Sequence, residues 1–429
     1  MLDVLKQINL FFWGGPMMLL LMGTHLYFTF SLHFVQRKVF RGIRLSGQNL
    51  TVLTTTLAAT LGTGNIIGVG TAVYMGGPGA VFWCWLTGLL GMATTYAEAY
   101  LSIQYRDGQT GLGGPMILLQ NICKKKKLAT LYSICICLSA FCIGGMTQSG
   151  AITMTVTSTF HLPRWLAIFI VVVVVGLVLF LGMSAIETFL EKLVPAMGFF
   201  FLGGCFLLLF LGSDMLLPSL KAIFQGAFSP SAFGGGILGY TVSHAIRHGI
   251  ARGLYTNEAG LGTAGIIAAG STSPNGHSNT HSFKHTPEEG ALISMCATFF
   301  DTVVLCAITG ISLTIFLLRF PNVIPLISSS NLTSIAFQSL PFYGSEILGI
   351  STICFALATI IGWSYIGNNA ILFLNKKNGV HGYKFLYLLS VLSGGLITFD
   401  FIWELTDLIN LFLAVPCLYA LLTLRKKVH

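Results

Sequence analysis

Charged residues are scarce in this chain: Asp, Glu, Lys and Arg together make up 9% of its 429 residues. A soluble globular domain carries roughly 25%, so the chain has too few charged groups to cover a water-facing surface. Hydrophobic residues make up 54%, and the mean hydropathy is +0.80. The composition excludes an ordinary soluble domain and predicts an integral membrane protein in contact with lipid.

Sequence motifs of enzymes are also missing. The chain contains no CxxC pair, no GxSxG motif and no phosphate-binding P-loop. Its ten cysteines lie mostly inside apolar runs, where they are expected to be buried thiols. We therefore expect that the protein is not an enzyme.

Histidine pairs leave one remote alternative, an intramembrane metalloenzyme. His244 and His248 form an HxxxH pair, but Ala245 stands where a zinc protease would have its Glu. A polar segment contains three more histidines at intervals of four residues, namely His277, His281 and His285. We interpret that segment as a solvated loop and expect no metal site among these histidines.

The formal net charge of +9 does not indicate nucleic acid, because the basic residues form no face interleaved with aromatic side chains. Most of the 23 Lys and Arg lie in short segments between apolar runs. With the N-terminus outside, seventeen fall in inner segments and four in outer ones, and Arg247 and Arg252 remain within a span. The positive-inside rule then predicts an outer N-terminus and a cytoplasmic C-terminus.

Long apolar runs are abundant, and a spanning helix needs about 20 such residues. The runs predict eleven spans: 8–35, 48–72, 79–104, 129–157, 165–182, 192–212, 233–269, 290–318, 345–374, 385–403 and 406–424. The seventh run is too long for one straight helix and rich in glycine. We expect it to be broken or re-entrant.

A short segment of the second span returns in the seventh. "LGTGNIIGVG", Leu61 to Gly70, recurs as "LGTAGIIAAG", Leu261 to Gly270. The two spans have opposite directions in the predicted topology, which is typical of inverted repeats in secondary transporters. We predict one all-α transmembrane domain, 1–429, with an extra N-terminal helix at 8–35 and five-helix repeats at 48–212 and 233–424. Chance similarity remains open, as does an earlier break in the seventh span, at 240–246.

The second span is predicted to unwind at membrane depth. Six glycine or polar residues cluster there: Thr60, Gly62, Thr63, Gly64, Asn65 and Gly68. Each glycine costs about 1 kcal/mol relative to alanine in a helix. Unwound backbone offers N–H groups to an anion and C=O groups to a cation. The cluster therefore favours a site for a zwitterion with a metal cation over simple close helix packing.

The chain resembles the alanine-or-glycine:cation symporter family, the sodium:alanine symporters. The resemblance rests on long motifs over nearly the whole chain, at 54–73, 76–100, 113–116, 191–197, 245–264 and 358–367. The most specific are "GGPGAVFWCWLTGLLGMATTYAEAY" and "AIRHGIARGLYTNEAGLGTA". Membership implies the five-plus-five inverted-repeat fold of the amino acid–polyamine–organocation superfamily.

The resemblance also implies a substrate site. In the second span it assigns Thr60, Gly62, Thr63 and Gly64, whose N–H groups would hold the carboxylate of an amino acid. Elsewhere it assigns Gln148 to the head group and Val242, Ile246 and Trp363 to the substrate side chain. A Trp wall would restrict the substrate to alanine or glycine.

A cation site is implied between the unwound span and the ninth. It would use the carbonyls of Ala58, Leu61 and Phe355 and the hydroxyl of Thr359. Oxygen ligands suit a hard cation such as sodium. Family members usually read Ser-Thr where this chain has Ala358-Thr359, so one hydroxyl of the implied set is missing.

Three ionisable residues inside the spans are further candidates. Glu258 is expected to pair with Arg252, as a gate or a structural lock. Asp301 has no sequence-local partner and would be the first candidate for a proton site.

These observations predict a symporter that imports alanine or glycine, in L or D form, with sodium across a bacterial or archaeal cell membrane. Its expected partners are the amino acid, sodium and the lipid bilayer, with no cofactor and no obligate protein partner. A proton-coupled permease of the same fold is the alternative. An ion channel is a remote one, because the chain has no filter motif.

Overall fold

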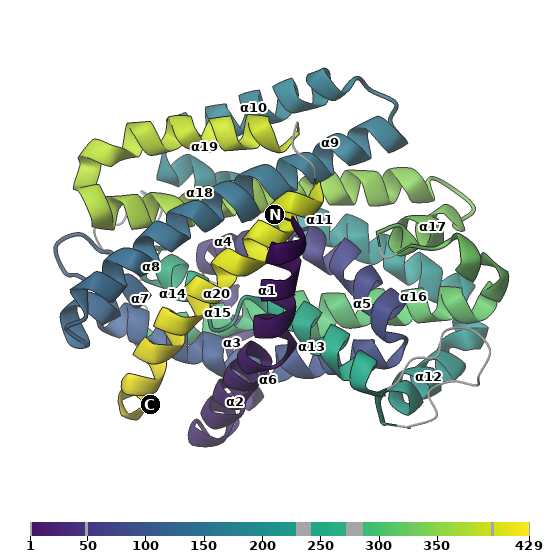
Figure 1. The fold of residues 1–429 in the computed structure, drawn as a ribbon, viewed down its shortest axis with the longest axis horizontal. Coiled ribbons are helices and arrows are strands. Elements are labelled where there is room, and N and C mark those ends of the chain that lie inside the picture. Colours follow the sequence, from purple (N-terminus) through teal and green to yellow (C-terminus); the bar gives the residue numbers. More distant parts are fainter. Residues whose placement is uncertain are drawn as a thin grey trace.

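Helices form all the regular structure in the part of the chain that the computed structural model describes, residues 2–47, 50–228, 242–271, 286–328, 330–395 and 399–428. Their arrangement is shown in Figure 1. The α-helices are α1 (Leu2–Gly14), α2 (Pro16–Ser31), α3 (Val39–Ser46), α4 (Leu50–Thr60), α5 (Val69–Gly76), α6 (Gly79–Gln104), α7 (Pro115–Ile117), α8 (Lys126–Ser139), α9 (Gln148–Thr159), α10 (Arg164–Leu181), α11 (Met183–Leu211), α12 (Leu216–Phe228), α13 (Val242–Asn257), α14 (Thr263–Ser271), α15 (Pro287–Thr298), α16 (Ala307–Arg319), α17 (Leu332–Gln338), α18 (Gly344–Asn375), α19 (Val380–Gly394) and α20 (Phe399–Thr423).

Seven of the described helices are long and apolar enough to cross a membrane, or up to nine if each of two bent pairs counts as one span. This agrees with the predicted all-α membrane fold but does not reach the predicted eleven spans. The two predicted spans that are not found are 233–269 and 385–403. Each contains residues outside the described ranges, 233–241 in the first and 396–398 in the second. The described parts of these runs form α13 and α14 in the first, and α19 with the start of α20 in the second.

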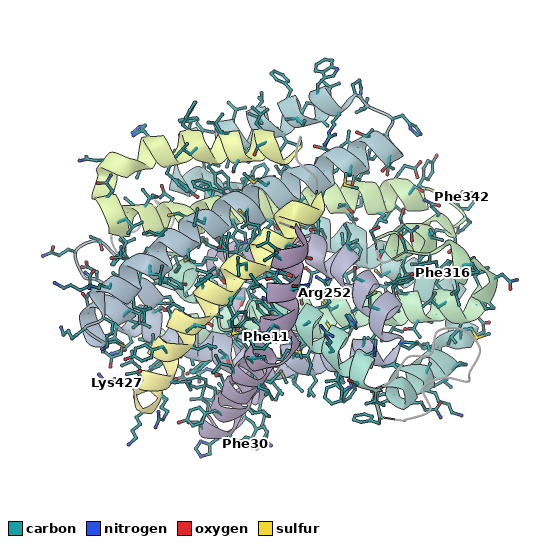
Figure 2. All side chains as sticks on the ribbon, in the orientation of Figure 1. Phe11, Phe30, Arg252, Phe316, Phe342 and Lys427 are labelled. Atoms are coloured by element: carbon teal, nitrogen blue, oxygen red, sulfur yellow. The ribbon has the colours of Figure 1, made fainter. Side chains whose placement is uncertain are left out.

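The outer surface of the bundle is apolar. Phe199 and Phe210 on α11 are each 78% exposed, and other large hydrophobic side chains are exposed on α10. Figure 2 shows Phe30 and Phe342 at the periphery of the molecule. Contiguous exposed apolar surface of this kind marks contact with a membrane, as the composition predicts.

Helix α6 is central to the packing and contacts α2, α12, α13, α14 and α15. Small residues bring α13 close to it. A Cβ added at Gly253 would lie 1.9 Å from Thr87 Oγ1, and one at Gly249 would lie 2.4 Å from the Ala80 carbonyl oxygen. Glycines four residues apart allow such close approach in membrane helices. This contact holds one of the two broken helices in place.

Four π-helical segments occur among the described residues. Three of them are η2 (Gly64–Gly68) before α5, η4 (Ala140–Thr147) between α8 and α9, and η6 (Phe299–Cys306) between α15 and α16; the fourth, η3 (Leu118–Ile122), follows α7. Such segments are frequent at functional sites. Gly62 and Gln148 lie close to η2 and η4, and Asp301 lies within η6; the sequence identifies all three as candidate functional residues.

The N-terminal segment is attached to the last helix. Asn9 Nδ2 donates to Glu404 Oε2 at 2.7 Å, and Trp13 Nε1 donates to the Asp407 carbonyl oxygen at 3.0 Å. Figure 1 shows α1 beside α20.

The contact between α6 and α13 makes a testable prediction. Gly253→Ala places a methyl group against Thr87 and Cys84, so the thermal melting temperature of the purified protein is expected to fall, by an amount that corresponds to about 1–3 kcal/mol for overpacking. Gly198→Ala on α11 is the control, because a Cβ there meets no atom within 4 Å. The control should melt like the wild type or higher, since alanine favours helix. Equal melting temperatures for both variants would contradict this packing.

Candidate functional site

The second predicted span is broken as the sequence predicts. Helix α4 ends at Thr60, the next helical segment begins at Gly64, and the two parts meet at a bend of 57°. The Gly62 N–H donates to Asn65 Oδ1 at 3.2 Å, and the Leu61 carbonyl accepts from Thr359 Oγ1 at 2.9 Å. Side chains therefore replace the helical partners that the break removes.

The seventh predicted span is broken as well. Helix α13 ends at Asn257, and α14 begins at Thr263. Between them Glu258, Gly260 and Gly262 have φ angles of 50°, 97° and 88°, which no right-handed helix accommodates. The repeated Leu-Gly-Thr sequence thus lies at both breaks. The sequence left open an earlier break at 240–246. Residues 242–246 are helical, so the break does not lie there, and residues 240 and 241 lie outside the described ranges.

Two neighbouring helices hold the second break. The Glu98 carboxylate on α6 accepts from the Gly260 N–H, and the Tyr132 hydroxyl on α8 donates to the Leu261 carbonyl at 2.7 Å. Glu98 is 1% exposed and Tyr132 is fully buried. Glu98 is thus a fixed acceptor for the broken backbone, whereas the sequence did not single it out for this role.

The residues implied for the cation site converge between α4 and α18. Thr359 Oγ1 lies 2.9 Å from the Leu61 carbonyl oxygen and 3.0 Å from that of Phe355. A Cβ at Gly362 would lie 3.0 Å from the Ala58 carbonyl carbon, so Ala58 is at the same contact between the helices. Ala358 is fully buried beside Thr359.

A small pocket lies against the first break. Its lining comes from the two broken spans, from η4 and α9, and from α18 and α20. The lining residues are Ala59, Thr60, Gly62, Gly64, Ile143, Gln148, Tyr255, Thr256, Glu258, Thr359 and Asn410. A Cβ at Gly64 would lie 3.3 Å from Thr256 Cγ2, so the two broken spans meet at this pocket.

Half of the substrate residues implied by the sequence reach this pocket. Thr60, Gly62, Gly64 and Gln148 line it. Thr63 does not, although its hydroxyl is buried and has no partner among the described residues.

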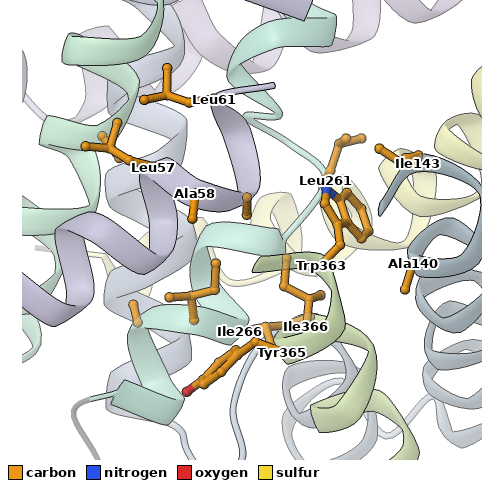
Figure 3. Close-up of a cluster of buried hydrophobic side chains, with 14 of the residues drawn as sticks. Leu57, Ala58, Leu61, Ala140, Ile143, Leu261, Ile266, Trp363, Tyr365 and Ile366 are labelled. Carbon is orange, nitrogen blue, oxygen red and sulfur yellow. The ribbon is translucent and has the colours of Figure 1, made fainter. Parts of the chain in front are cut away.

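Trp363 lies behind the pocket. It is fully buried and is not in the lining. Figure 3 shows Trp363 in a buried cluster that also contains Leu261 and Ile143. A Cβ added at Gly144, the residue after Ile143, would lie 2.4 Å from Trp363 Cβ. Trp363 therefore packs against the segment that carries the lining residue Ile143.

Val242 and Ile246 are not brought to the pocket. They stand at the beginning of α13, fifteen and eleven residues before its last residue, Asn257. At 1.5 Å per residue even the nearer one lies roughly 16 Å along the helix from that end. These two residues were implied by the resemblance to the family. With the break at Glu258, that place is taken by residues just before it, Tyr255 and Thr256.

Five pocket residues were not assigned from the sequence: Ala59, Ile143, Tyr255, Thr256 and Asn410. Tyr255 and Thr256 directly precede the repeated segment, within the motif "GLYTNEAGLGTA". Asn410 is an uncharged polar residue within the apolar run "LINLFLAV" of the last span. These signals identify polar residues inside spans, but only the fold places them at one cavity.

Two of the charged candidates have partners on other segments. Glu258 Oε2 accepts from the Thr263 hydroxyl at 2.9 Å, and Arg252 interacts electrostatically with Asp407 on α20. The expected pair of Arg252 and Glu258 stays a prediction.

Asp301 has partners from two spans. Its Oδ1 accepts from Asn65 Nδ2 at 2.5 Å, and its Oδ2 accepts from the Thr302 hydroxyl at 2.6 Å. Asn65 also binds the Gly62 N–H. Asp301 is therefore linked through one side chain to the break in the second span.

Within the described ranges, no group of three or more His, Cys, Asp or Glu side chains is placed to hold a metal ion. The rings of His244 and His248 lie 5.9 Å apart. The histidines of the loop, at 277, 281 and 285, lie outside the described ranges.

The Glu98 contact is testable by thermal melting. Glu98→Leu leaves the Gly260 N–H without its acceptor, and an unsatisfied buried donor destabilises by about 1–3 kcal/mol. Glu98→Gln retains a carbonyl oxygen and should melt closer to the wild type. If Leu and Gln variants melt together at the wild-type temperature, Glu98 does not hold the break.

Comparisons with known proteins agree with this geometry. The family described as the sodium:alanine symporter family matches residues 1–429. The sodium/alanine symporter AgcS of Methanococcus maripaludis is 34% identical over 98% of this chain and 94% of its own length. The probable sodium/glutamine symporter GlnT of Bacillus subtilis is 28% identical over 97% and 87%.

A solved structure has a similar fold. A mutant of the Eremococcus coleocola manganese transporter superposes with a TM-score of 0.53, at 15% identity, over 87% of this chain and 79% of that one. At this identity the likeness concerns the fold alone.

Proposed function

The chain belongs to the sodium:alanine symporter family, a family of sodium-coupled amino-acid symporters, and from this premise we propose that its substrate is alanine or glycine. The relatives include proteins named for alanine and one named for glutamine, so the family alone leaves the substrate open. The lining of the pocket supports alanine or glycine over the larger glutamine. Ile143 is an apolar lining residue of this small pocket and would limit the length of the substrate side chain.

One observation carries the sodium part of the proposal. The Thr359 hydroxyl lies within 3.0 Å of two carbonyl oxygens, those of Leu61 and Phe355. A hydroxyl has one hydrogen and donates to one acceptor at a time. One of the two carbonyl oxygens is therefore left without this hydroxyl as a donor. A hard cation bound among the two carbonyl oxygens and the hydroxyl oxygen would interact with all three.

The substrate would lie on the other side of the break. The helical segment that begins at Gly64 has its N-terminal end in the pocket lining, so the positive end of its dipole would lie at the pocket. This end would favour the carboxylate of an amino acid. Sodium and substrate then bind to neighbouring parts of one unwound segment, which makes their binding interdependent.

The proposed architecture is a single transmembrane domain, 1–429, of two inverted five-helix repeats, 48–212 and 233–424, after an extra N-terminal helix. The Leu-Gly-Thr sequence at both breaks supports the repeat. Rocking of the helices around the pocket would alternate access between the two sides. We place the protein in a bacterial or archaeal cell membrane with the N-terminus outside and the C-terminus in the cytoplasm.

A second candidate is proton coupling, favoured by one contact. Asp301 is fully buried and is linked by Asn65 to the break. A proton on this carboxyl would alter that hydrogen bond, and so would link protonation to the geometry of the substrate site.

The proposed function is tested by uptake of radiolabelled alanine and glycine into proteoliposomes. A sodium gradient is expected to drive saturable uptake with counterflow, and a proton gradient alone is not. Uptake driven only by protons and lost in Asp301→Asn would establish the second candidate. Uptake of neither amino acid under either gradient would reject the proposal.

The cation site makes a separate prediction. Thr359→Val keeps the shape of the side chain but removes the hydroxyl, so half-maximal uptake should need at least about tenfold more sodium. Ala358→Ser adds the hydroxyl that the family usually has and should lower the sodium requirement. Ala356→Ser is the control, because it introduces a hydroxyl at another fully buried position of α18. Identical sodium dependence in all variants would place the ion elsewhere.

A further inference from the structure

A second pocket lies at the bend between α2 and α3 and shares no lining residue with the first. Its volume is about 550 Å³, which is within the range of small-molecule sites in proteins. Two consecutive residues of the bend, His33 and Phe34, have φ angles of 51° and 60°. Strained backbone of this kind in non-glycine residues is concentrated at functional sites. The proposed transport cycle gives this pocket no role.

The lining of this second pocket is basic. It includes His33, Arg37 and Lys38, and none of the described residues that form it is Asp or Glu. Arg37 Cζ lies 5.2 Å from the centroid of the Phe34 ring, and stacking on an aromatic face leaves the N–H groups in the guanidinium plane available. A guanidinium next to an ammonium group is a set of donors that suits a phosphate.

One carboxylate lies close to these cations and is shared between two of them. Glu288 on α15 accepts from Lys38 Nζ at 3.1 Å and from Arg41 at 3.2 Å. Arg37 forms no ion pair with a described residue. Because the three side chains of the shared pair are exposed, the pairs contribute little stability. Lys38 can therefore bind a phosphate while Arg41 keeps its contact with Glu288, and the bend retains an excess of positive charge.

The surroundings of the second pocket favour a lipid headgroup over a free phosphate. Phe30 and Phe40, on the two sides of the bend, are 62% and 77% exposed, and Phe34 in the lining is 41% exposed. Val428 also lines the pocket, and Figure 2 shows Phe30 and Lys427 toward the same edge of the molecule. With the C-terminus in the cytoplasm, this edge lies at the inner leaflet, where basic pockets bind anionic headgroups.

We propose that the pocket at the bend between α2 and α3 binds the phosphate of an anionic phospholipid, with Arg37 and Lys38 as its main ligands. The acyl chains lie against the exposed phenylalanine side chains beside it. This site is separate from the transported amino acid and from sodium, and it adds a lipid requirement to the proposed function.

The bend connects the lipid site to the first broken span. Helix α3 packs closely on α15, because a Cβ added at Gly42 would lie 2.5 Å from Cys296 Sγ. The next helix after α3 is α4, the first half of that span. A lipid held by Arg37 and Lys38 restrains the segment that precedes α4. Since a ligand that binds the folded state stabilises it, the bound lipid raises the melting temperature.

The test uses the purified full-length protein in a neutral detergent, with phosphatidylglycerol or phosphatidylcholine of the same acyl chains added to the micelles. Phosphatidylglycerol is expected to raise the melting temperature in a saturable way. Phosphatidylcholine, whose headgroup has no net charge, is not. Arg37→Gln combined with Lys38→Gln removes both cations from the lining and should weaken phosphatidylglycerol binding at least about tenfold.

Arg44→Gln combined with Lys426→Gln is the matched control. It removes the same charge from two exposed side chains that do not line the pocket, and phosphatidylglycerol binding should fall by less than about threefold. Elution from a sizing column shows which variants keep the fold. Arg37→Gln alone breaks no described ion pair, so it replaces the double variant if that one does not fold, and it should weaken binding about fivefold.

Three results overturn the lipid site. They are a wild type that phosphatidylglycerol does not stabilise, equal stabilisation by phosphatidylcholine, and a control that loses as much binding as the lining variant, which would indicate general attraction to surface charge. Soluble glycerol phosphate separates the two sources of the phosphate: if it stabilises the wild type at the same concentration as the lipid, the pocket takes a free phosphate and the lipid proposal is overturned. None of these results involves alanine uptake, so the proposed function would stand.

Discussion

The structure depends on one constraint: backbone groups that leave a helix at membrane depth need other partners. Lipid offers none, so unwound backbone is stable only inside protein or beside a polar cavity. Both breaks meet this condition through side chains of other helices. Thr359 serves the Leu61 carbonyl, while Glu98 and Tyr132 serve the second break.

This constraint connects stability to transport. One partner of the broken backbone, Thr359, also lines the pocket, so ligand binding there would change a contact between helices. Thr359 is the clearest case, because the same hydroxyl joins α18 to the first break and would bind sodium. Sodium bound here would take the place of the hydrogen bond between Thr359 and the Leu61 carbonyl, which joins the two helices. A site of this kind would therefore not need to be rigid.

The tight packing elsewhere gives the breaks their positions. Gly253 and Gly249 bring α13 against α6, and α6 in turn carries Glu98 to Gly260. Three π-helical segments near the centre adjust the register of their helices, so that Gln148 and Asp301 point inward rather than along a regular helical face. The polar residues of the core are thus placed by contacts between apolar or small residues.

The sequence by itself determined the membrane class, the positions of most helices and the break at Leu61-Gly62-Thr63, because hydropathy and glycine clustering act locally along the chain. The family motifs added the residues around Thr359, which are correctly brought together. Only the tertiary structure decided that the second break lies at Glu258, which moves Val242 and Ile246 away from the pocket and brings Asn410 to it. Such residues meet across helices far apart in sequence, and their meeting depends on bend angles and helix rotations that no local pattern encodes.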